Sequence, residues 1–172
     1  MFRRLAAALF PYGIMEISAY HESGHAYMAT YVGARVRLVT IDPELGDGAD
    51  RFGDTHVEWN IAGWSDELVA EKSLWVALAG PAVEIIYTGD PYHPGLVAEW
   101  ADDWDEAVEQ ALVLHKDRKQ ALEYLEQTTL DLITMLRQDR HWAPVAALAD
   151  HLLAHDTLEM FEIESLLHNW LR

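Results

Sequence analysis

Five residues, His21-Glu22-Ser23-Gly24-His25, lie within an apolar stretch and restrict both the fold and the chemistry of this chain. Residues four apart share one face of an α-helix, so both imidazoles can reach a single metal ion. Glu22 is turned by about 100° around the helix axis, which leaves it near the metal without having to bind it. The segment therefore predicts a zinc hydrolase site, with two nitrogen ligands and a carboxylate that can take a proton from water.

Length and composition limit the remaining possibilities. The 172 residues predict a single domain, 1–172, and 51% of them are hydrophobic, enough for a substantial core. With 29 acidic and 12 basic residues the net charge is −17, which disfavours binding to nucleic acid or to anionic lipid. There are no cysteines, so any metal must be held by His, Asp or Glu. No stretch approaches 18 consecutive apolar residues, so we expect a cytoplasmic protein with no membrane span.

The first half of the sequence predicts one helix followed by a small sheet. Residues 1–14 form an N-terminal extension, and residues 15–33 form the helix that carries the HExxH motif and ends at Gly33. Alternating polar and apolar residues predict strands over 35–41 and 55–59, which could pair across an acidic loop at 42–53.

The second half is predicted to be helical. Ser65 is typical of a helix cap, and that helix should run to about Tyr87 with a kink or break at Gly80-Pro81. A loop over 89–95 leads to the C-terminal helices, 97–172: one long helix or two joined helices over 97–137, then helices over 141–154 and 160–171. The expected fold class is mainly α (α+β), a zincin-like helical domain with a small sheet or hairpin beside the HExxH helix.

A catalytic zinc ion usually has three protein ligands, so one is still to be found. The extended metzincin signature is excluded, because Met28 and Tyr31 occupy its glycine and third-histidine positions. The third ligand should therefore be a carboxylate from another helix. Glu99 and Asp103 are candidates on one helical face, and Glu84 is a further alternative. Periodicity does not choose among them.

The segment Ala19-Tyr20-His21-Glu22-Ser23-Gly24-His25-Ala26 resembles the zinc motif of the FtsH family, the ATP-dependent zinc proteases. That family continues with a strand ending in Ile-x-Pro, as in 41–43 here. Residues 77–87 are similar to its Leu-Gly-Gly-Arg-x-Ala-Glu-Glu-Ile-Ile-Tyr helix, and 102–107 to its Asn-Asp-Leu-x-x-Ala segment. The resemblance extends from about residue 14 to the end. It implies zinc held by His21, His25 and Asp103.

The chain also departs from that family. Pro81 stands where the family has Arg, and Val83 stands where it has the first of two acids. The segment between Tyr87 and Asp103 lacks the family's Ser-Thr-Gly-Ala-Ser run and is several residues longer. No Gly-x-x-x-x-Gly-Lys-Ser/Thr loop is present in the sequence, so the ATPase module is missing.

Together these features predict a zinc-dependent metallopeptidase that works without its own ATPase, with Glu22 as general base. Its substrates should be peptides or unfolded protein segments, or a separate unfoldase or adaptor delivers them. The strand over 55–59 could pair with an extended substrate. The alternative is a proteolytically inactive, zinc-stabilised helical adaptor or interaction module. The sequence gives neither the cleavage specificity nor the oligomeric state.

Overall fold

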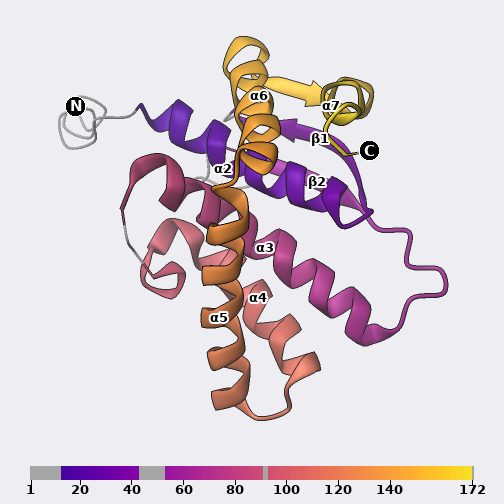
Figure 1. Ribbon diagram of the computed structural model, residues 1–172, viewed down its shortest axis with the longest axis vertical. Helices are drawn as coiled ribbons and strands as arrows, with labels where there is room; N and C mark the ends of the chain where they lie inside the picture. The colour runs from indigo at the N-terminus through magenta and orange to yellow at the C-terminus, as the bar shows by residue number, and fades with distance from the viewer. Residues whose placement is uncertain (1–12, 43–52, 91–92, 172) are drawn as a thin grey trace.

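The computed structural model describes residues 13–42, 53–90 and 93–171, and within them the fold is mainly helical with a three-stranded antiparallel sheet (Figure 1). This confirms the predicted fold class. Most of the N-terminal extension and of the loop at 42–53 lies outside the described residues. Two further residues of the loop predicted over 89–95, residues 91 and 92, also lie outside them.

Helix α2, Ile14–Tyr31, is the predicted HExxH helix and runs through the centre of the molecule. Its residues from 21 to 29 are all buried, because α3 covers one side of it and α6 another. The helix ends at Tyr31 with Val32 as its C-cap, and Gly33 follows with a φ of +94°, a conformation that glycine adopts without a steric penalty. The predicted stop is confirmed.

The sheet has the strand order β2-β1-β3, with β1 at Arg35–Thr40, β2 at Asp54–Glu58 and β3 at Thr157–Glu159. The predicted pairing of the first two strands is confirmed, with Val36 opposite Val57 and Val39 opposite Thr55. The third strand was not predicted, because three residues are too few to display an alternating pattern. Strand β2 therefore lies at an edge of the sheet as the structure describes it.

Helix α3, Asp66–Thr88, begins as predicted, with the Ser65 hydroxyl accepting a hydrogen bond from the Leu68 backbone N–H. Of the kink or break predicted at Gly80-Pro81, the break does not occur, and α3 continues as one helix through Pro81. A proline inside a helix costs about 3 kcal/mol. Here the residues around it, from 76 to 83, are all buried, and this packing offsets the cost.

The C-terminal half begins with two short 3₁₀ turns, η1 at Pro94–Leu96 and η2 at Ala98–Trp100. Of the two possibilities left open for 97–137, two helices are observed: α4, Ala101–Leu114, and α5, Arg118–Leu136. Helix α6, Asp139–His155, starts two residues before the predicted position. Helix α7, Met160–Leu167, ends four residues before its predicted end.

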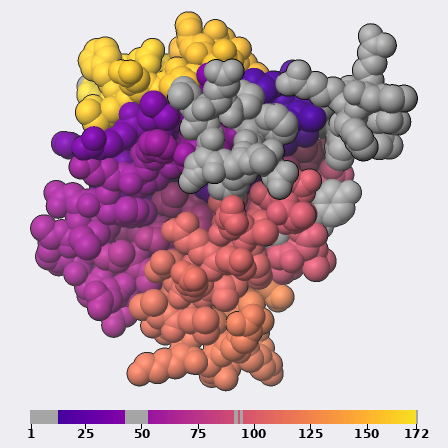
Figure 2. All heavy atoms as spheres, turned by 180° about the vertical axis from the view of Figure 1, so that it is seen from behind, coloured from indigo at the N-terminus to yellow at the C-terminus, as the bar shows by residue number. Residues whose placement is uncertain are grey.

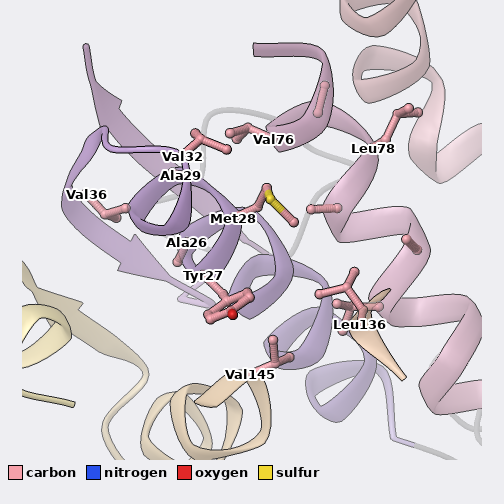
Figure 3. Close-up of a cluster of buried hydrophobic side chains, with 14 of the residues drawn as sticks. Ala26, Tyr27, Met28, Ala29, Val32, Val36, Val76, Leu78, Leu136 and Val145 are labelled. Atoms are coloured by element: carbon pink, nitrogen blue, oxygen red, sulfur yellow. The ribbon is translucent and has the colours of Figure 1, made fainter. Parts of the chain in front are cut away.

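Buried side chains from the helices and from the sheet form the core, and Figure 3 shows Tyr27 of α2 beside Val145 of α6. The sheet with α7 forms one end of the molecule, and α4 with α5 forms the other (Figures 1 and 2). Helix α2 passes between these ends. The motif is therefore held on a buried scaffold with helices packed on more than one side.

Candidate metal centre

Three buried side chains from distant parts of the sequence meet at the candidate metal centre. His21 and His25 come from α2, and Asp103 comes from the first turn of α4. Their exposed fractions are 8%, 8% and 6%. The two Nε2 atoms lie 3.0 Å apart, and the Asp103 carboxylate oxygens lie 3.1 Å from His21 Nε2 and 3.4 Å from His25 Nε2. The structure thus brings together the ligand set that the sequence predicts.

The other ring nitrogen of each histidine already has a partner. His25 Nδ1 lies 2.7 Å from the backbone carbonyl oxygen of Val76, which can only accept, so this nitrogen carries the hydrogen. His21 Nδ1 lies 2.9 Å from Glu84 Oε2. In neutral imidazoles both Nε2 atoms then direct lone pairs toward each other and toward Asp103. Three electron-rich groups at such distances require a shared cation or proton between them.

The spacing of these atoms fits one metal ion. Zinc bonds of about 2.0–2.1 Å in tetrahedral geometry separate neighbouring ligand atoms by roughly 3.3–3.4 Å. The observed separations of 3.0–3.4 Å agree with that value. Two imidazole nitrogens and a carboxylate suit zinc or another transition metal better than calcium or magnesium, which prefer all-oxygen sites. Three protein ligands are also the number found in catalytic rather than structural zinc sites.

The pKa values of His21 and Asp103 are shifted by their contact with each other. Burial by itself would lower the pKa of His21, but hydrogen bonds to Asp103 and Glu84 outweigh burial and raise this pKa to about 10. Burial would raise the pKa of Asp103, but the two histidines hold it well below its usual range. A proton on His21 therefore balances the Asp103 carboxylate, and a bound metal would take its place.

The three carboxylates proposed as the third ligand lie at different positions relative to the histidines. Asp103 faces both histidines, whereas Glu99 lies on η2 and is exposed. Glu84 contacts His21 at the opposite ring nitrogen from Asp103, so it orients the ring instead of facing the ion. This orienting role was not among the sequence predictions.

Two glycines lie where α2 and α3 pack closely against each other. A Cβ atom at Gly80 of α3 would overlap Nε2 of both His25 and His21. At Gly24 it would lie 2.6 Å from the carbonyl oxygen of Ala79, where α2 and α3 approach each other. Sequence reasoning missed the role of Gly80. Its spacing of four residues from Glu84 is the signal that could have revealed it, because that spacing places both on one face of α3.

Glu22 is 5% exposed and is fixed by the neighbouring strand. The Thr55 hydroxyl of β2 donates a hydrogen bond of 2.7 Å to Glu22 Oε2. A Cβ atom at Gly53 would overlap the Glu22 carboxyl group, so the chain just before β2 also passes close to it. Thr55 is a second site residue that sequence reasoning missed, because strand pairing alone does not reveal contacts with α2.

A cleft of about 320 Å³ opens beside these residues. Its lining comes from β2, from the flanking residue Trp59, and from α2, α3 and α4. Glu22, His25 and Asp103 all line it, so the candidate centre can be reached from outside. The full lining consists of Glu22, His25, Asp54, Thr55, Val57, Trp59, Ser73, Val76, Ala77, Asp103 and Glu106.

Several other histidines lie on the surface. His56 pairs with Asp54 on the surface, and His151 and His155 are exposed on α6. Of the tryptophans, Trp59 lines the cleft, whereas Trp100 and Trp104 are not among its lining residues. Trp100 is buried, and its indole N–H donates to Glu84 Oε2 at 2.6 Å.

Comparison of the chain with protein-family models gives no match, and comparison with curated proteins gives none either. The resemblance to the FtsH family therefore stays a prediction from the sequence motifs. Among the described residues, no helix has both the length and the apolar character needed to cross a membrane.

Proposed function

We propose that this chain is a zinc-dependent peptidase that hydrolyses peptide bonds and needs no ATP as an isolated chain. One observation carries the proposal: two members of a buried His₂Asp group, His25 and Asp103, line the same open cleft as the carboxylate of Glu22. The motif resemblance to the FtsH proteolytic domain supports peptides as the substrate class. The donor set supports zinc.

In this proposal His21, His25 and Asp103 hold the ion, which when bound would polarise the scissile carbonyl group and make water more acidic. Glu22 accepts the proton of the attacking water and passes it to the leaving amine. The Thr55 hydroxyl keeps the Glu22 carboxylate directed into the cleft. Gly80 leaves the space in which both imidazoles can lie side by side.

The position of β2 supports an extended substrate. Among the described strands β2 is at the edge of the sheet, and Asp54, Thr55 and Val57 line the cleft. An extended peptide can add to such an edge through backbone hydrogen bonds. Folded proteins do not offer such a segment, so the substrates are peptides, unfolded segments or chains that a separate unfoldase or adaptor delivers.

The test uses zinc-loaded protein with unfolded casein and a peptide library. We expect cleavage by the wild type, and a loss of roughly 10²–10⁴-fold in rate for Glu22→Gln with its zinc content unchanged. Glu16→Gln is the matched control, since it makes the same substitution on α2 outside the cleft. Residual activity of Glu22→Gln near the wild-type rate would reject Glu22 as the base. A zinc-loaded wild type that leaves every substrate intact would favour the inactive adaptor.

A further inference from the structure

Trp100 and Glu84 form a chain of hydrogen bonds that ends at His21. The Trp100 indole N–H lies 2.6 Å from Glu84 Oε2, and the same oxygen lies 2.9 Å from His21 Nδ1. An indole N–H can only donate, so the Glu84 carboxylate must accept from Trp100. One carboxylate oxygen therefore joins the indole to the imidazole.

Trp100 also stands at the start of the helix that supplies the third carboxylate. It is the N-cap residue of α4, and Asp103 follows in the first turn. Trp100 is 3% exposed, so its side chain is held by burial as well as by its hydrogen bond to Glu84 of α3. The position of α4 and the orientation of the His21 ring thus depend on the same side chain.

We infer that Trp100 is a positioning residue for the metal centre: it orients Glu84, which in turn fixes the His21 ring with Nε2 toward Asp103. Partners of this kind raise ligand basicity and prevent ring rotation, and their loss typically lowers metal affinity 10–100-fold. The inference rests on the metal binding that the proposed function requires, but not on peptide cleavage.

The experiment measures zinc affinity by competition with a chelating dye for the purified full chain. Trp100→Phe keeps an aromatic ring and removes the N–H, and we expect its zinc affinity to fall 10–100-fold. Trp104→Phe is the matched control on α4, because its indole packs against His93 and Gly95. We expect this control to bind zinc as the wild type does.

A double-mutant cycle separates positioning from general loosening of the fold. In a Glu84→Ala background, Trp100→Phe should cause no further loss of zinc affinity, because the carboxylate that connects Trp100 to His21 is already absent. The melting temperature of the metal-free protein is measured in parallel, and the zinc-induced increase in melting temperature should be smaller for Trp100→Phe than for Trp104→Phe.

Three results would overturn the inference: wild-type zinc affinity in Trp100→Phe, an equal loss in Trp104→Phe, or an additive loss in the Glu84→Ala background. Failure of the proposed function has a different signature. A wild type that binds no zinc rejects both the metal centre and the role of Trp100. Zinc binding that depends on Trp100 in a protein without peptidase activity rejects only the peptidase.

Discussion

Buried histidines lie at two places along helix α2, and the groups that surround them differ in charge. His21 and His25 meet the carboxylates of Asp103 and Glu84. Two residues beyond His25, Tyr27 contacts His141 of α6 through a hydrogen bond of 2.7 Å between its hydroxyl and Nδ1 of the histidine. All three histidines are less than 9% exposed. Burial is therefore similar, and only the partners differ.

The pKa of each buried histidine depends on the groups that contact it. The pKa of His21 is raised to about 10, whereas burial, together with the charge of Arg140, lowers the pKa of His141. His141 Nε2 has no hydrogen-bond partner in the described part of the chain, so a proton there would be buried without compensation. A buried histidine becomes a candidate ligand only where other helices bring carboxylates to it. At His141 the imidazole is a neutral packing element.

The largest expected effect comes from filling the space between α3 and the histidines. Gly80→Ala should lower zinc affinity by roughly 100-fold or more, about 2.7 kcal/mol, because the new methyl group overlaps both Nε2 atoms. In an unobstructed helix, replacing glycine with alanine stabilises the helix by about 1 kcal/mol. Here the lack of space at Gly80 makes the same replacement unfavourable. Dye competition measures the affinity. Gly13→Ala is the control, because its Cβ meets only Glu16 at 4.0 Å. Wild-type affinity in Gly80→Ala would contradict the close packing.

A smaller effect is expected where β2 meets α2. Thr55→Val keeps the shape of the side chain but removes the hydrogen bond to Glu22, and bonds to charged groups contribute about 1.5–3 kcal/mol. We expect kcat/KM for a cleaved peptide to fall roughly tenfold or more, with zinc content unchanged. Thr134→Val on the exposed side of α5 is the control. Lost zinc in Thr55→Val would show that this hydrogen bond supports the ligands instead of the base.

The smallest effect concerns the pH dependence of stability at His141. Its pKa is lower in the folded chain than in the unfolded chain, so protonation below about pH 6.5 favours unfolding. The His141→Gln variant can still hydrogen-bond Tyr27 but cannot take up the proton. We expect it to lose less stability than the wild type between pH 7.5 and pH 5.5, measured by urea unfolding. His151 is exposed, so the stability of the control variant His151→Gln should change with pH as the wild type's does. Identical slopes for His141→Gln and wild type would contradict a neutral buried imidazole.

Local signals in the sequence predicted the elements that build the site. The apolar stretch around residues 15–33, the alternation before and after the acidic loop, and the Ser65 cap each reflect short-range physics, and each element is observed. The prediction of a kink or break at Gly80-Pro81 was wrong as to the break, because burial of the surrounding residues outweighs a local rule. The short strand β3 could not be predicted, since its pairing with β1 depends on a contact over more than 100 residues.

The sequence did not predict the residues that contact the candidate ligands and Glu22. The i, i+4 spacing predicts that His21 and His25 share a face, but nothing local indicates that Trp100 and Glu84 meet, or that Thr55 reaches Glu22. These contacts arise from the packing of separate helices and strands. Asp103 was chosen over Glu99 only through the family resemblance, and the structure places Asp103, not Glu99, beside the histidines.

The most direct test of the account is the zinc content of four purified proteins measured side by side: wild type, His25→Ala, Asp103→Asn and Glu99→Gln. The wild type and Glu99→Gln should each hold one zinc ion per chain, and the other two variants should hold far less under the same dialysis. Zinc retained by Asp103→Asn at the wild-type level, or no zinc in the wild type, would contradict a centre built from His21, His25 and Asp103.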